Sequence, residues 1–361
     1  MKSKEVNFTI LPLVSPSYER DEIDLAQIRR YAYNSFDEFP KEDRAVAWLA
    51  LLHVYPMNPR EWPKVSSDIN EKYWDFVSSC QLENWHRLNY PCQLVNTVLD
   101  CPNKNLMGTI HGDIVRTGKS IFCFKPAPIP LKEGEKVFPS DEPMYEFAEH
   151  ARRLERVLYI FSTLNPGLSY MQGYNEILCP LYYVLYEAIS LFHNDWDLVE
   201  ALTFKCFQVL MSESRLNEFY TTADKSSIIL HRLNDFTTLI KKHLPNVYSV
   251  LERFDIHPLL YCYRWFNLLF SQEHDFSTLL LIWDDLFGHF DELMDFAFYI
   301  GLGHIKEFEG QITTLNDYSK ILSILQNLND INIKNVLNTA NKFWEADHSI
   351  SPLEKFRNLF F

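Results

Sequence analysis

Apolar side chains recur at helical spacing along most of the chain. Between residues 144 and 161 they follow one another at steps of three and four, and charged side chains fill the positions between them. This pattern predicts an amphipathic helix, which the Asn165-Pro166-Gly167 run ends. The same spacing, with Asp195, Ser226, Pro258 and Ser277 as starting signals and Gly288 as a stop, predicts further helices over residues 43–56, 66–87, 195–211, 226–244, 257–270 and 275–288.

Glycine is scarce, with only 10 among 361 residues, and this also favours helices over folds that need many tight turns. No repeat and no linker divides the chain, so we predict an all-α fold built as one extended domain. One long irregular segment, residues 124–143, contains five prolines. Because proline cannot join a helix interior, we expect this segment to be a mobile or weakly packed loop.

Charge and cysteine usage exclude several classes of function. The 34 Lys and Arg residues are outnumbered by 48 Asp and Glu residues, and this disfavours nucleic-acid binding. Seven cysteines form no CxxC pair and follow no secretory signal, so we expect reduced thiols in the cytoplasm and no metal site. The most apolar stretch, residues 177–192, is interrupted by Pro180 and Glu187. We therefore predict a soluble protein without direct membrane insertion.

The segment GDIVRTGKS, residues 112–120, superficially matches a phosphate-binding loop. That loop needs four residues between its first glycine and the Gly-Lys pair, whereas five separate Gly112 from Gly118. No apolar strand precedes it, so the chain is not expected to hydrolyse a nucleotide by itself. The run LLLIWD, which ends at Asp284, mimics a magnesium-binding strand, but its flanks predict a helix with Asp284 as a structural hydrogen-bond acceptor.

Two short motifs gain meaning from their order. Taken singly, Arg116 in IHGDIVRT would be a surface side chain and Gln172 in YMQG a turn residue. Together they resemble the two signature motifs of the TBC domain, the module of GTPase-activating proteins for Rab GTPases. The runs YRWFNLLF, LLLIWDDLF and ERVLYIFSTLNPGLSYMQG match further family motifs. The resemblance covers about residues 30–330 and is greatest to the subfamily of TBC domain family member thirteen. The positions that match the signature motifs are Ile110, Asp113, Arg116, Tyr170, Gln172 and Gly173.

The resemblance implies a TBC domain over residues 30–330, an N-terminal flank over 1–29 and a helical C-terminal flank over 331–361. It implies a GTP-bound Rab-family GTPase as partner, with GTP and Mg²⁺ held by that partner and no cofactor of the chain's own. Arg116 would stabilise charge on the phosphates, and Gln172 would position the attacking water. Arg116 and Gln172 are the two catalytic fingers that the resemblance implies. The residues implied to support them are Asp113, Ile110, Tyr170, Gly173 and Asn175.

Two functions stay open at this point. The chain is either a catalytic activator that regulates vesicle trafficking, recruited to endomembranes through its partner, or a non-catalytic scaffold that binds a Rab. Degenerate members of the family lose the two finger residues, and this chain keeps both. Tyr174 stands where the family usually has methionine. We expect the turn around Gln172 to tolerate this larger side chain.

Overall fold

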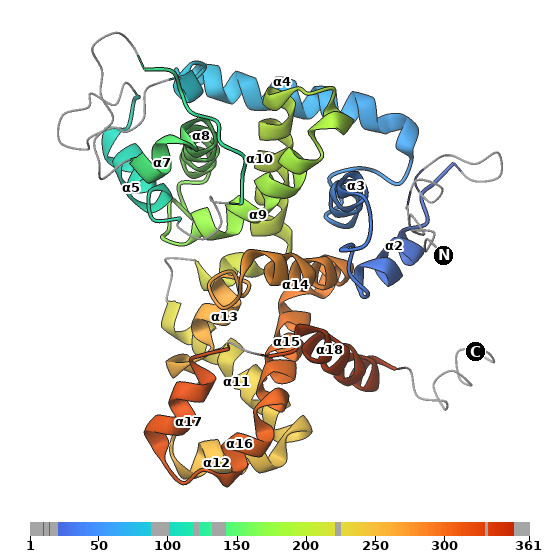
Figure 1. Cartoon of the computed structure of the whole chain (residues 1–361), viewed down its shortest axis with the longest axis vertical. Coiled ribbons are helices and arrows are strands. Elements are labelled where there is room, and N and C mark those ends of the chain that lie inside the picture. The colour runs from blue at the N-terminus through green and yellow to red at the C-terminus, as the bar shows by residue number, and fades with distance from the viewer. Residues whose placement is uncertain are drawn as a thin grey trace, which may run out of the picture. The chain divides into compact units, whose positions relative to one another are not determined.

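The computed structural model describes residues 10, 14, 21–87, 101–117, 123–131, 142–220, 225–328 and 331–349. Every regular element in these ranges is an α-helix or a short 3₁₀-helix, and no strand occurs in them, so the predicted all-α class is confirmed (Figure 1). The chain forms two compact units: residues 1–225 with 275–291, and residues 226–274 with 292–361. The sequence predicted one extended domain. The predicted boundaries at residues 30 and 330 stay a prediction.

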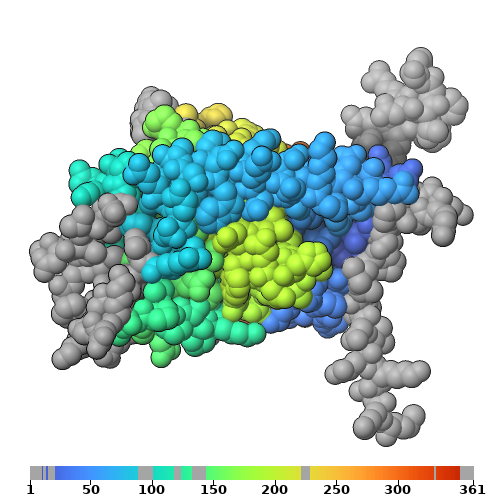
Figure 2. All heavy atoms as spheres, turned by 90° about the horizontal axis from the view of Figure 1, so that it is seen from above, coloured from blue at the N-terminus to red at the C-terminus, as the bar shows by residue number. Residues whose placement is uncertain are grey.

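In the first unit, α8 is surrounded by α5, α9, α10 and the short helix η2 (Figure 1). Helix α4 packs along α10 (Figures 1 and 2). Helix α14 packs on α2 and α3. The elements of this unit are α2 (Leu25–Ala32), α3 (Lys41–Leu51), η1 (Pro59–Glu61), α4 (Trp62–Ser79), η2 (Trp85–Arg87), α5 (Lys104–Ile114), α7 (Glu142–Tyr145), α8 (Ala148–Leu164), α9 (Tyr174–Glu187), η3 (Ile189–Phe192), α10 (Trp196–Glu213), η4 (Leu216–Phe219) and α14 (Phe276–Gly288).

In the second unit, α15 packs against α13, α16 and α18, and α12 packs against α16. Helix α18 lies in the predicted C-terminal helical flank, and a side chain at Gly303 of α15 would collide with the backbone of Val336. The elements are α11 (Lys225–His243), α12 (Pro245–Arg253), η5 (Pro258–Leu260), α13 (Tyr263–Asn267), α15 (Leu293–Glu307), α16 (Glu309–Thr314), α17 (Tyr318–Leu325) and α18 (Ile333–His348), and η6 (Phe290–Glu292) precedes α15.

Helix α14 confirms the predicted helix and its end at Gly288 but corrects its N-terminal cap. Its N-terminal cap is Asp275, whose carboxylate accepts the backbone N–H of Thr278 at 2.9 Å, so the predicted cap at Ser277 is wrong. Gly288 is the last helical residue, and its need for glycine comes from packing: an added Cβ would lie 2.8 Å from a ring carbon of Tyr33. The fully buried Asp284 accepts hydrogen bonds from five donors, which confirms its predicted structural role.

Two predicted helices are broken in the structure. The one expected over residues 66–87 is α4, which ends at Ser79, followed by η2, because the backbone turns through a left-handed conformation at Gln81 (φ 58°). The one expected over residues 257–270 is η5 followed by α13. It ends at Asn267, since Leu269 and Phe270 have φ values of 46° and 63°. Local apolar spacing does not reveal such turns.

Helix α8 confirms the predicted helix but differs from it in its start and in the burial of its charges. It starts at Ala148, after a separate short α7, and its charged residues Arg152, Arg153, Glu155 and Arg156 are all buried. The guanidinium of Arg156 donates to both carboxylate oxygens of Glu200 on α10, each at 2.6 Å. Paired charges of this kind can be buried because each partner replaces the water that the other loses.

The first part of the proline-rich segment, residues 124–130, is packed at two positions: Phe124 and Ile129 are buried, whereas Pro126, Pro128 and Pro130 are exposed. Phe124 is buried against the rings of His150, Tyr182 and Tyr186. The backbone N–H of Ala127 donates to the carbonyl of Glu146 at 2.6 Å. The ring contacts and this hydrogen bond hold the start of the segment although proline supplies no N–H of its own. The centre of the predicted loop, residues 132–141, lies outside the described residues.

Candidate functional site

Arg116 stands just beyond the C-terminal end of α5. The helix begins after Asn103, whose side chain accepts the N–H of Leu106 at 3.0 Å, and Ile110 is buried in the core beneath it. The side chain of Arg116 is 67% exposed, and its guanidinium forms an ion pair with the nearly buried carboxylate of Asp113 one turn earlier. The helix therefore presents an exposed cation that is held at its base by a buried anion.

Gln172 lies in a tight turn that directly precedes α9. The N–H of Tyr174 donates to the carbonyl of Met171 at 3.2 Å, and Gly173 has φ 105° and ψ −14°. These are the angles of the third residue of a type II turn, a position that favours glycine. Gln172 itself is exposed at the second position. Glycine is thus needed after Gln172 for backbone reasons, and the turn projects the amide into solvent.

Side-chain hydrogen bonds from Tyr170 and Asn175 join these motifs; the longest of them runs from the Asn175 amide to the carbonyl of Asp113 at 3.5 Å. The hydroxyl of Tyr170 donates to Asp113 Oδ2 at 2.8 Å, while Asp113 Oδ1 accepts from Arg116. The amide of the buried Asn175 donates to Thr117 Oγ1 at 2.8 Å. The structure therefore brings together the predicted residues from both motifs, with the Gln172 turn between the two points of attachment. Thr117 was missed at the sequence level; its only signal was its place directly after Arg116.

Tyr174 fills the core beneath the turn. It is fully buried, and its ring makes edge-to-face contacts with Phe161, Phe207 and Tyr220. Its hydroxyl has no hydrogen-bond partner among the described residues, and burial raises its pKa. The larger side chain is therefore accommodated in the interior, away from the exposed Gln172. Burial also raises the pKa of Tyr170, and the bond to Asp113 adds to this.

The phosphate-loop alternative finds no support in the local structure. Gly112 lies inside α5, so a helix precedes Arg116 where a phosphate loop would require a strand. Residues 118–120 lie outside the described residues. Among the residues that the structure describes, no group of three or more His, Cys, Asp or Glu side chains is placed to hold a metal ion, and the six cysteines there form no disulfide.

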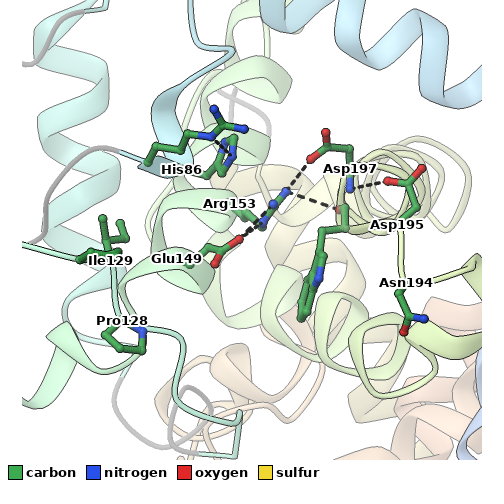
Figure 3. A pocket seen from close by; sticks show the side chains of 11 residues that line it. His86, Pro128, Ile129, Glu149, Arg153, Asn194, Asp195 and Asp197 are labelled. Atoms are coloured by element: carbon green, nitrogen blue, oxygen red, sulfur yellow. Dashed lines mark hydrogen bonds and ion pairs between the residues drawn. The ribbon is translucent and has the colours of Figure 1, made fainter.

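A pocket of about 680 Å³ lies elsewhere in the first unit, between η2, residues 128–130, α8 and the start of α10 (Figure 3). None of the motif residues lines it. The guanidinium of Arg153 at its floor is paired with Glu149 and Asp197, both at 3.1 Å. Burial, with Arg153 and Arg156 nearby, lowers the pKa of His86 to about 4, so His86 adds no charge near neutral pH. Three ionic groups of this pocket, Glu149, Arg153 and Asp197, therefore pair with one another.

Comparison with known protein families matches residues 132–313, about half of the chain, to the Rab-GTPase-TBC domain. The chain therefore belongs to the Rab-GTPase-TBC domain family, as its motifs predicted. The matched range includes Gln172 and begins after Arg116.

Curated relatives agree with this assignment. The human TBC1 domain family member 13 is 30% identical over 198 residues, which cover 55% of this chain and 48% of that protein. The mouse protein of the same name is 36% identical over 140 residues, which cover 38% of this chain and 34% of that protein. The chain thus spans about half, or less, of the length of these relatives. They confirm the predicted likeness to this subfamily.

A solved structure shares the fold. The Ypt/Rab-GAP domain of Gyp1p superimposes with a TM-score of 0.70 at 19% identity, over 95% of this chain and all of that one. No helix in the described part of the chain is both long and apolar enough to cross a membrane.

Proposed function

We propose that this protein accelerates GTP hydrolysis by a GTP-bound Rab-family GTPase and supplies Arg116 and Gln172 to the reaction. The observation that carries the proposal is the exposed Arg116, held by buried Asp113 and hydrogen-bonded through Asp113 and Tyr170 to the turn of Gln172. Two relatives that match the chain at 20–24% identity bear the names GTPase-activating protein GYP1 and GYP7, in Saccharomyces cerevisiae and Candida glabrata. The shared family and this arrangement support the same function.

The chemistry asked of Arg116 is electrostatic. Negative charge develops on the phosphate oxygens during hydrolysis, and an arginine delivered from outside stabilises it, raising rates by roughly 10³- to 10⁵-fold. Asp113 engages one terminal nitrogen of the guanidinium. A guanidinium carries five N–H donors, so donors remain for phosphate oxygens while Asp113 fixes the direction of the side chain.

Gln172 would act on the attacking water. A primary amide both accepts and donates hydrogen bonds, so its oxygen can accept a hydrogen bond from the water and orient the lone pair of the water toward the phosphate. The type II turn fixes the backbone on both sides of this side chain. GTP and Mg²⁺ would arrive with the partner, and the protein would need no cofactor of its own. By returning a Rab to its GDP state, it would regulate vesicle trafficking at the membrane that carries that Rab.

The test is a panel of purified Rab proteins loaded with GTP, each assayed for hydrolysis with and without the full chain. Acceleration of at least one Rab is the expected result. A parallel binding assay on the same panel separates the two open functions. Tight binding to a GTP-loaded Rab without any acceleration would instead identify the protein as a non-catalytic scaffold.

A further inference from the structure

The last turn of α5 is bonded to a buried carboxylate on α8. His111 is 2% exposed, and its Nδ1 lies 2.6 Å from Oε1 of the fully buried Glu155. The other oxygen of Glu155 accepts from Trp85 Nε1 at 2.9 Å and from Arg152 Nη1 at 2.8 Å. Burial would raise the pKa of Glu155, but Arg152 and His111 lower it to about 2. Glu155 is therefore an ionised acceptor, and His111 must donate the proton of their bond.

Helix α5 is attached to α8 at its other end as well. The N–H of Asn103, the cap residue of α5, donates to the hydroxyl of Tyr159 at 2.9 Å. Glu155 and Tyr159 are four residues apart on α8, so one face of that helix holds both ends of α5. The attachment through His111 is the one near Arg116.

The backbone of His111 is also hydrogen-bonded to the residue next to Arg116. Its carbonyl accepts the N–H of Val115 at 3.0 Å, and Val115 is the residue directly before Arg116. The N–H of Arg116 in turn donates to the carbonyl of Asp113 at 3.0 Å. A displacement of His111 therefore passes directly to the backbone that carries the guanidinium.

We infer that His111 is a positioning residue for Arg116: its bond to Glu155 sets the place of the last α5 turn against α8, and so the point that the finger reaches. This inference rests on the proposed function. Neither His111 nor Glu155 touches the reacting groups, and the effect passes through α5 alone. Loss of an ordinary buried contact would lower stability and leave the hydrolysis rate of the folded protein unchanged, whereas loss of the His111 bond would also lower that rate.

Three full-length variants test this inference. His111→Leu removes the donor and keeps the volume, whereas His111→Asn keeps an amide donor near the position of Nδ1. Tyr73→Phe is the matched control, because it removes one buried hydroxyl that donates to Glu200 at 2.6 Å, away from α5. Each variant is assayed in single-turnover GTP hydrolysis at saturating concentration on a Rab that responds to the wild type, and its Kd for that Rab is measured separately.

At saturation, His111→Leu should hydrolyse roughly 10- to 100-fold more slowly, since small misplacements of a catalytic group have effects of this size. Its Kd should stay within about threefold of the wild-type value, because the lost interaction acts on the transition state. His111→Asn should recover most of the rate, and Tyr73→Phe should keep it. A wild-type rate in His111→Leu, an equal loss in Tyr73→Phe or a failure of His111→Asn to recover the rate would each overturn the inference.

Hydrogen exchange on the free protein gives a readout that does not depend on any Rab. His111→Leu should speed exchange in residues 104–117 and leave residues 174–187 unchanged, whereas equal protection of residues 104–117 in both proteins would contradict the inference. If no Rab responds to the wild type, the proposed function fails while this measurement still tests the attachment. If His111→Leu does not fold, His111→Gln is used in its place. The amide donor of glutamine lies one bond farther from the backbone than that of asparagine, so His111→Gln should slow hydrolysis and His111→Asn should not. Equal rates for these two variants would overturn the inference.

Discussion

Replacing Asp113 by asparagine tests the link between the two motifs. The carboxylate accepts from Arg116 on one oxygen and from Tyr170, at 2.8 Å, on the other. An amide of the same shape has one acceptor oxygen and one NH₂ group. In either orientation the negative charge is lost, and with the oxygen toward Tyr170 the NH₂ group faces the guanidinium of Arg116. Asp113→Asn should therefore weaken the restraint on the Arg116 side chain while Arg116 itself stays unchanged.

The loss of stability expected for Asp113→Asn depends on how far the side chains that contact Asp113 are exposed to solvent. A hydrogen bond to a charged group contributes about 1.5–3 kcal/mol to stability. The Arg116 side chain is 67% exposed, so its ion pair adds little to stability, and most of the loss comes from replacing the charged acceptor of the Tyr170 bond by a neutral one. We expect a loss of about 1–2 kcal/mol, which lowers the Tm of a unit of this size by about 2–8 °C. The hydrolysis rate at saturation should fall roughly 10- to 100-fold, because Arg116 loses its restraint.

The assay combines thermal unfolding with single-turnover hydrolysis on a responsive Rab. Tyr55→Phe serves as the control, since it removes a buried hydroxyl that lies 2.7 Å from Ser66 Oγ, away from both motifs. The control should lose similar stability and keep the wild-type rate. If Asp113→Asn kept the wild-type rate at saturation, the ion pair with Arg116 would have no part in placing the finger.

Three further substitutions give defined outcomes. Gly173→Ala should destabilise the protein by about 1–3 kcal/mol in denaturant titrations, because φ 105° is unfavourable for any other residue. Asp284→Ala should cost about 3–5 kcal/mol in the same assay, since it leaves Arg44 and the other donors without their buried acceptor. Glu155→Gln should lose roughly 3 kcal/mol at pH 7, because the pKa of Glu155 lies at about 2 in the folded protein and at 4.5 in the unfolded reference. Because folding lowers the pKa of this carboxyl, the difference in free energy of unfolding between the wild type and Glu155→Gln is full above about pH 5 and shrinks as the pH falls toward 2. Unfolding curves measured across this pH range would show the change.

Features set by neighbouring residues could be predicted from the sequence. Asp195 caps α10 as expected, with its carboxylate accepting from the backbone N–H groups of Asp197 and Leu198. Where two capping residues stood close together, the prediction chose Ser277 and the structure uses Asp275. The glycine after Gln172 was expected from the motif, and its positive φ supplies the physical reason.

Features set by distant partners could not be predicted. The amphipathic pattern gave no sign that charges of α8 are buried, because Glu200, the partner of Arg156, lies 44 residues farther along the chain. The same holds for the site: the two motifs identified Arg116 and Gln172, but the bond between Thr117 and Asn175 spans 58 residues. Only the packing of α5 beside α8 and α9 brings such pairs together.

The most direct test of the proposed function is single-turnover GTP hydrolysis by a responsive Rab with saturating Arg116→Ala. The control is Arg60→Ala, which removes another exposed arginine of the first unit that is ion-paired at 3.0 Å, with Asp21. We predict that Arg116→Ala lowers the rate by at least roughly 10²-fold, that Arg116→Lys fails almost as badly because an ammonium lacks the planar fork, and that Arg60→Ala retains the wild-type rate. A wild-type rate in Arg116→Ala, with the protein folded and bound to the Rab, would contradict the catalytic role of Arg116.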